Sequence, residues 1–99
     1  MATPESRVKA KVDKLLKLFD DCWFFSPQAG PYGRSGVPDR VGVIGGRMFA
    51  VECKAGKGVL TALQSRCIAD MQAAGCECFV VRDDETLKDL KNWLIGNDK

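Results

Sequence analysis

The stretch MFAVECK, residues 48–54, is the part of the sequence on which the predicted fold and the predicted site both depend. It is predicted to form a β-strand, in which successive side chains alternate between the two faces of a sheet. Glu52 and Lys54 then share one face, whereas Phe49, Val51 and Cys53 share the other. A carboxylate and an ammonium on one face of an otherwise apolar strand indicate a functional site.

A second carboxylate is expected beside this pair. The turn GVPD, residues 36–39, places Asp39 at the start of the preceding strand, predicted at 39–44. A two-glycine turn at 45–46 joins that strand to the next one, so Asp39 and Glu52 are expected on neighbouring strands of one hairpin.

Two acids and a lysine on adjacent strands predict metal-dependent cleavage of a phosphodiester. A hard divalent cation prefers oxygen ligands, polarises a phosphate and acidifies bound water. Asp39 and Glu52 are the candidate metal ligands, with the backbone carbonyl of Cys53 as a third. Lys54 is expected to orient or stabilise the attacking hydroxide and to offset charge in the transition state. The alternative is structural, because Glu-x-Lys is often a weak ion pair on an exposed strand and Pro-Asp a common turn.

The composition of the chain bounds what it can be. Its 99 residues allow a single domain, 1–99, and 45% hydrophobic and 28% charged residues are ordinary for a globular protein. No apolar stretch approaches the roughly 20 residues of a membrane span. The N-terminus leads directly into a charged helix, so a signal peptide is not expected. We therefore expect a cytoplasmic protein. Net charge is only +2, but basic residues cluster in the first segment and around the candidate site (Arg34, Arg40, Lys54 and Lys57), and such clusters can bind phosphates. For the lysines of the first segment taken alone, a solvated helix face is the favoured interpretation.

Histidine and cysteine usage excludes several chemistries. The chain has no histidine, which rules out Ser-His-Asp and Cys-His catalysis and a histidine general base. Its five cysteines contain no Cys-x-x-Cys pair, and Cys76 and Cys78 have the wrong spacing for a zinc knuckle, so zinc is not expected. The cysteines are instead predicted to be small buried hydrophobes in a reducing cytosol.

Hydrophobic periodicity and turn residues predict an α/β fold in the order α-β-β-β-α-β-α, a mixed sheet flanked by helices. The predicted elements are a helix at 4–20, strands at 22–26, 39–44 and 47–54, a helix at 61–74, a strand at 76–82, and a last helix that begins after Asp83 or Asp84 and frays from Gly96. The strand at 76–82 has few polar residues and is expected to be central in the sheet. Leu63 is expected among the inward-facing residues of the second helix, and the glycine-rich segment 55–58 is expected to be mobile.

The motifs SGVPD (35–39), VECKAGK (51–57) and LQ (63–64), with a glutamate in the first helix, resemble the VRR-NUC (virus-type replication-repair nuclease) family of the PD-(D/E)xK superfamily. The resemblance spans nearly the whole chain. It implies a restriction-endonuclease-like fold and Mg²⁺- or Mn²⁺-dependent cleavage of DNA. One departure is Cys53, where an aliphatic residue is commoner; this costs nothing if only its carbonyl binds metal.

The same resemblance implies roles for individual residues. Asp39 and Glu52 would be the metal ligands and Lys54 the catalytic lysine, while Glu5 would be a supporting acid and Gln64 a helix glutamine near the site. Glu5 also suits the helix dipole, and Gln64 fits a capping box that begins at Thr61, so position alone explains both.

Weaker candidates lie around this set. Tyr32, Arg34 and Lys57 are expected on loops beside the strands, where they are candidates for contacting DNA phosphates or bases. Trp23 and Trp93 are expected in the core or an interface rather than as platforms on which bases stack. Trp23, Phe24 and the last helix are candidates for a dimer interface.

Small stand-alone members of the family look like phage or bacterial proteins that act as homodimers on four-way junctions. A Holliday junction resolvase in a bacterial or phage-infected cell is therefore expected, since paired incisions need a two-fold axis. Alternatives are a nuclease acting on nicks, flaps or ends, a non-catalytic DNA-binding accessory, and a small interaction domain in which Glu52 and Lys54 merely pair.

Overall fold

The structure is a computed structural model that describes residues 3–28 and 33–99. It has the predicted element order, with three helices and four strands. They are α1 (Pro4–Leu16), β1 (Cys22–Phe25), β2 (Arg40–Ile44), β3 (Arg47–Cys53), α2 (Ala62–Ala73), β4 (Glu77–Val81) and α3 (Asp84–Asn97). Among the described residues, no helix is long and apolar enough to cross a membrane.

The four strands form one mixed sheet in the order β1-β2-β3-β4. The β1–β2 and β2–β3 pairs are antiparallel, and β3–β4 is parallel. A mixed sheet is thus confirmed, but the central position predicted for the fourth strand is wrong, because β4 pairs only with β3. Its low polarity has another cause: α2 packs on one face of β4 and α3 on the other, so both faces are covered.

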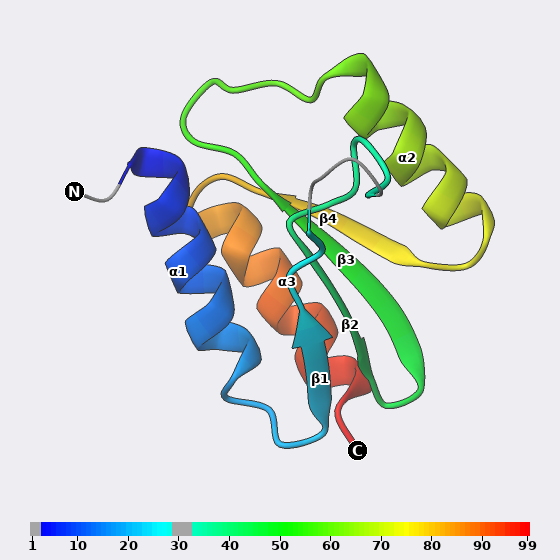
Figure 1. Ribbon diagram of the computed structural model, residues 1–99. Coiled ribbons are helices and arrows are strands. Elements are labelled where there is room, and N and C mark those ends of the chain that lie inside the picture. Colours follow the sequence, from blue (N-terminus) through cyan, green and yellow to red (C-terminus); the bar gives the residue numbers. More distant parts are fainter. Residues whose placement is uncertain (1–2, 29–32) are drawn as a thin grey trace.

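The helices divide between the two faces of the sheet (Figure 1). The main core joins α1 and α3 to one face, where Phe49, Val51 and Cys53 of β3 are fully buried. On the opposite face, Ala50 packs with residues beside α2 and β4. The alternation predicted along β3 therefore places Glu52 on the α2 side of the sheet.

Two helix ends differ from the prediction. The first helix ends at Leu16 rather than at residue 20, and tight turns follow, with Leu18 N–H donating to Leu15 O and Phe19 N–H to Leu16 O. Phe19 still packs on the core, which is why the apolar period continues past the helix end. The last helix continues through Asn97, whose side chain donates to Trp93 O.

One further expectation needs correction. Leu63 is 62% exposed, because it lies on the outer side of the first turn of α2. The segment 55–58 accepts two hydrogen bonds from Arg82, whose Nη1 donates to Gly58 O at 2.8 Å and to Gly56 O at 3.3 Å.

Gly42 is a position where the sheet allows no side chain. A Cβ there would lie 2.5 Å from Trp23 O and 2.7 Å from Phe49 Cζ. We expect Gly42→Ala to lower the free energy of unfolding by about 1–3 kcal/mol, because β1 or the core must shift. Gly96→Ala is the matched control, since its Cβ meets nothing within 4 Å and alanine favours the helix by about 0.5–1 kcal/mol. Urea unfolding of both variants measures the difference; equal stability would contradict the close packing of β1 on Gly42.

Candidate functional site

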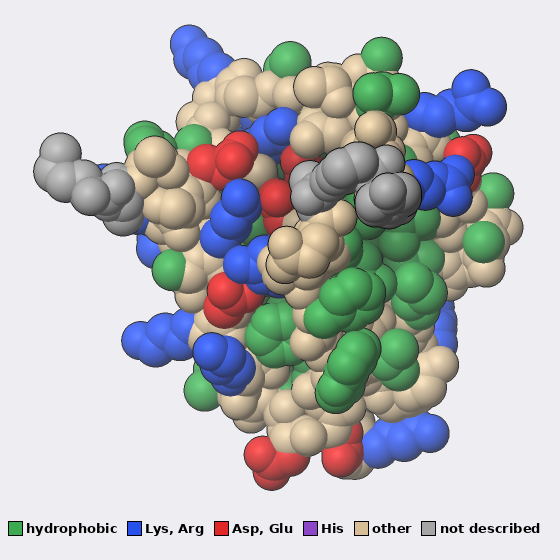
Figure 2. Space-filling view, viewed as in Figure 1, with side chains coloured by type: hydrophobic (Ala, Val, Ile, Leu, Met, Phe, Trp, Pro, Cys, Tyr) green, Lys and Arg blue, Asp and Glu red, His purple; other side chains and the backbone are tan. Residues whose placement is uncertain are grey.

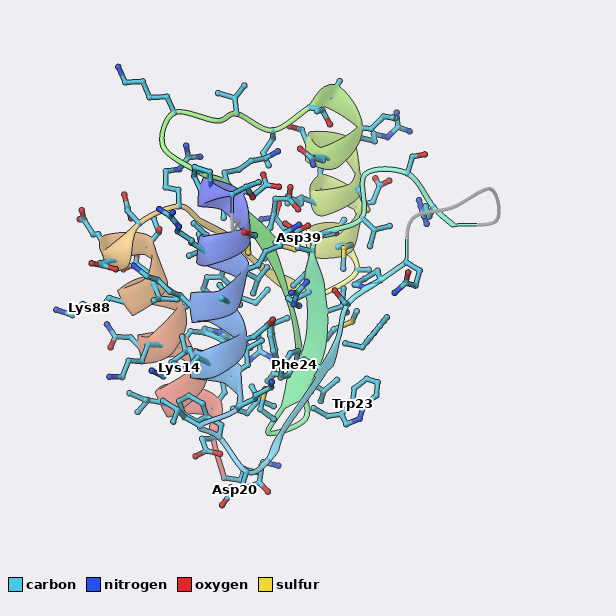
Figure 3. All side chains as sticks on the ribbon, turned by 60° about the vertical axis from the view of Figure 1, so that its left-hand side comes forward. Lys14, Asp20, Trp23, Phe24, Asp39 and Lys88 are labelled. Atoms are coloured by element: carbon cyan, nitrogen blue, oxygen red, sulfur yellow. The ribbon has the colours of Figure 1, made fainter. Side chains whose placement is uncertain are left out.

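Asp39 and Glu52 come together where β2 begins and β3 ends. Asp39 directly precedes β2, and its Oδ2 accepts a hydrogen bond of 2.8 Å from the backbone N–H of Cys53. Glu52 is only 3% exposed and is the one buried charged residue among those described. Figure 3 shows Asp39 at this end of the sheet, beside the first turns of α1.

The two carboxylate oxygens of Glu52 have different surroundings. Oε2 accepts from Gln64 Nε2 at 2.8 Å and lies 3.5 Å from Lys54 Nζ. Oε1 is buried and has no hydrogen-bond partner among the described residues. A buried polar atom without a partner is costly, so this oxygen marks a place where a ligand would be stabilised.

Gln64 forms the capping box that its position predicted and also contacts Glu52. Its backbone N–H donates to Thr61 Oγ1 and its Oε1 accepts from the Thr61 N–H, which completes a capping box. Its Nε2 remains free to bind Glu52. The cap therefore fixes the amide group that orients the buried carboxylate.

Gly36 allows the segment that carries Asp39 to approach α2. Its φ is +79°, and a Cβ would lie 2.5 Å from Leu63 O. A side chain at this position would push the loop away from the first turn of α2, where Gln64 lies. Close backbone contact thus keeps Asp39 and Gln64 near the same end of β3.

Helix α1 contributes two charges to this end of the sheet. Lys9 Nζ lies 3.6 Å from Asp39 Oδ1 and 3.8 Å from Glu5 Oε2. Glu5 is therefore connected to Asp39 by Lys9, which forms an ion pair with each of the two carboxylates. The contact of Lys9 with Asp39 was not predicted, although the spacing of four residues between Glu5 and Lys9 places both on one side of the helix.

Arg40 holds the backbone of Asp39 in place; the sequence predicted its place among the basic residues around the site but not its contacts. Its guanidinium binds both carboxylate oxygens of Asp13 on α1, at 2.6 and 3.0 Å. Its Nη1 donates to Asp39 O at 2.7 Å and to Ser26 Oγ at 2.6 Å. The hydrogen bond to Asp13 raises the pKa of Arg40, so this cation joins α1 to the start of β2 at any ordinary pH.

The surroundings of Glu52 favour the protonated form of its carboxyl group, because they raise its pKa. Burial raises the pKa of Glu52 to about 7, and the charge of Asp39 adds to the rise, whereas Lys54 opposes it. Burial, with a further contribution from Asp39, also raises the pKa of the Cys53 thiol to about 12. Cys53 is thus a neutral core thiol, and only its backbone is available to the site. The other cysteines are free thiols and buried or half-buried, as predicted.

Two of the weaker candidates, Arg34 and Lys57, lie outside this cluster. Arg34 is largely exposed and lies 3.8 Å from Asp70 on α2. Lys57 is exposed on the segment that Arg82 anchors. Tyr32 falls outside the described residues.

Asp39 and Glu52 form a small oxygen donor set that fits a divalent cation. Within residues 3–28 and 33–99, no three His, Cys, Asp or Glu side chains gather as a metal cluster. Mg²⁺, however, is commonly held by one or two carboxylates, with water and substrate phosphates as the remaining ligands. The partnerless Oε1 of Glu52 beside a second carboxylate suits such a cation.

Comparison with known proteins assigns no family. No protein-family model matches the chain, and no curated protein matches it either. The functional interpretation therefore depends on the geometry of the site and on the motifs in the sequence.

The raised pKa of Glu52 predicts how stability depends on pH. The pKa of Glu52 is about 7 in the folded protein, whereas its ordinary value, expected in the unfolded chain, is 4.5. Between these two pH values the folded state therefore binds more protons than the unfolded state. The contribution of Glu52 to the free energy of unfolding is fully present below pH 4.5 and is lost as the pH rises through about 7. We expect the wild type to lose about 1–3 kcal/mol across this range relative to Glu52→Gln, which cannot titrate. Denaturant unfolding in a chelating buffer measures both curves; parallel curves would contradict the raised pKa.

Proposed function

We propose that the protein is a metal-dependent, structure-specific DNA endonuclease with a restriction-endonuclease-like fold, and that it acts as a homodimeric Holliday junction resolvase of the VRR-NUC type. The observation that carries the proposal is the buried carboxylate of Glu52, with one oxygen lacking a partner and with Asp39 and Lys54 beside it. Asp39 directly precedes β2, Glu52 lies on β3 and Lys54 directly follows it, so the three residues gather at one end of the β2–β3 hairpin. The structural alternative, a surface ion pair, does not suit a glutamate that is only 3% exposed.

Each residue of the site has its own role in the proposed hydrolysis of a phosphodiester. Asp39 and Glu52, with the backbone carbonyl of Cys53, would hold Mg²⁺ or Mn²⁺. The bound cation supplies Lewis-acid polarisation of the phosphate and a more acidic water. Gln64 keeps Glu52 oriented through its 2.8 Å hydrogen bond. Lys54 Nζ, itself largely buried, provides a donor and a positive charge for the attacking oxygen or the transition-state phosphate.

An apolar patch on the sheet supports a second copy as the partner. Trp23, Val43 and Met48 are paired in register across β1, β2 and β3, and all three are exposed. Phe25 extends the patch, and its ring lies 5.6 Å from that of Trp23. Figure 2 shows apolar side chains gathered on this face. Phe24, a predicted interface residue, instead packs against the core on the other face.

The chemistry of the patch favours self-association. A two-fold interface places the same surface on both subunits, so an uncharged apolar patch is complementary to itself without any matching of charges. A dimer also suits the proposed substrate, because one small domain offers one metal site and resolving a junction requires two incisions.

Cleavage of a synthetic four-way junction tests the proposal. We expect wild-type protein with Mg²⁺ or Mn²⁺ to make symmetric paired cuts in a labelled, immobile junction. A single cut near an end, a nick or a flap would support the alternative nuclease. Tight binding without cleavage would support a non-catalytic accessory.

Lys54→Ala should lower the cleavage rate at least about 100-fold, because it removes charge stabilisation from the transition state. Folding and DNA binding should survive, as circular dichroism and gel shifts will measure. Lys17→Ala, an exposed lysine at the C-terminal end of α1, is the matched control and should cleave normally. A fully active Lys54→Ala protein would refute the assigned role.

Trp23→Glu should convert the dimer to a monomer, because it places a charge at the centre of the apolar patch. Sedimentation equilibrium measures the molecular mass. Val59→Glu is the control, since Val59 is 77% exposed but lies on the connection before α2. An unchanged dimer in Trp23→Glu would exclude this face as the interface.

A further inference from the structure

Lys9 is the one cation within ion-pair distance of the Asp39 carboxylate among the described residues. Arg40 follows Asp39 directly, but its guanidinium contacts only the backbone carbonyl of Asp39 and is otherwise bound to Asp13 and Ser26. Lys54 is paired with Glu52 instead. The ion pair of the Asp39 carboxylate within the described residues is therefore made with the first helix.

The position of Lys9 conflicts with a cation on Asp39. Lys9 Nζ is 3.6 Å from Oδ1, and the Cys53 N–H already occupies Oδ2. A divalent cation bound to Asp39 would meet the ammonium at a distance where repulsion between cations is strong. Lys9 and the metal ion thus compete for the same carboxylate.

Glu5 gives Lys9 an alternative partner. Glu5 Oε2 lies 3.8 Å from the same ammonium, four residues earlier on α1. The Lys9 side chain is about one-third exposed and has a flexible stem, so it can leave Asp39 and keep Glu5 without unfolding the helix. This arrangement explains why an acid of the first helix lies next to the site without contacting the metal ligands itself.

We propose that Lys9 is a resident counter-ion of the metal-free site, which neutralises Asp39 and is displaced toward Glu5 when a divalent cation binds. Lys9 is on this account a positioning residue that sets the affinity for the metal. The inference rests on the proposed function only in taking Asp39 as a metal ligand. It requires neither DNA nor cleavage.

Calorimetric titration of Mn²⁺ into DNA-free protein tests this role. Lys9→Met keeps the length and apolar stem of the side chain but removes its charge, and we expect it to bind Mn²⁺ about 3- to 10-fold more tightly than the wild type. The melting temperature should also rise more on addition of Mn²⁺ in Lys9→Met than in the wild type. Lys11→Met is the matched control, because Lys11 lies on the same helix but pairs with Asp84, and its affinity should equal that of the wild type.

The Mn²⁺ titrations distinguish failure of the counter-ion role of Lys9 from failure of the proposed nuclease function. Equal or weaker Mn²⁺ binding by Lys9→Met, with binding by the wild type intact, overturns the counter-ion role and leaves the proposed nuclease standing. Absence of binding in all three proteins overturns both. Circular dichroism checks the fold, and Lys9→Gln, which is polar and uncharged, must show the same tighter binding if Lys9→Met is poorly folded.

Discussion

The burial of the Glu52 carboxylate is the constraint on which the rest of the site depends. A carboxylate that is taken out of water needs hydrogen-bond donors or opposite charge, and an oxygen left without either raises the free energy of the fold. Here Gln64 and Lys54 satisfy one oxygen and leave the other without a partner. The position lies on β3, between its two neighbouring strands, so the residue cannot move to water without disturbing the sheet. A raised pKa is the direct consequence, because protonation removes the buried charge.

The surrounding elements are fixed by contacts that leave the site residues little freedom. Gln64 is held by the cap of α2, and the backbone of Asp39 is held by Arg40, which is bound in turn to α1. The Cys53 N–H binds the Asp39 side chain directly. The two carboxylates are therefore held near each other, despite their mutual repulsion, by hydrogen bonds to the backbone N–H of Cys53 and to the capped Gln64. Preorganisation of this kind is what a metal-dependent site requires.

The sequence predicted the element order, the mixed sheet and the shared face of Glu52 and Lys54, because alternation and turn residues are local signals. It did not predict the edge position of β4, since an edge strand covered by helices on both faces is as apolar as a central one. The ion pairs of Lys9 and Arg40 were not predicted for a different reason: their partners lie far along the chain or on another element, and no local pattern encodes such pairs. Gln64 could be placed near the site only through the motif resemblance, because its capping position explained it equally well.

Paired charges explain how a chain of 99 residues can keep several acidic side chains close together at this site. Acids and lysines alternate from Glu5 through Lys9 to Asp39 and from Glu52 to Lys54, so each carboxylate has a cation beside it. Within residues 3–28 and 33–99, Oε1 of Glu52 is the one buried side-chain oxygen that lacks a hydrogen-bond partner. On the proposed function, metal binding and folding are therefore linked: any ion that binds the folded site and not the unfolded chain stabilises the protein in proportion to the logarithm of its concentration. The oxygen that costs stability in the metal-free protein is thus the same atom that would provide its affinity for the metal.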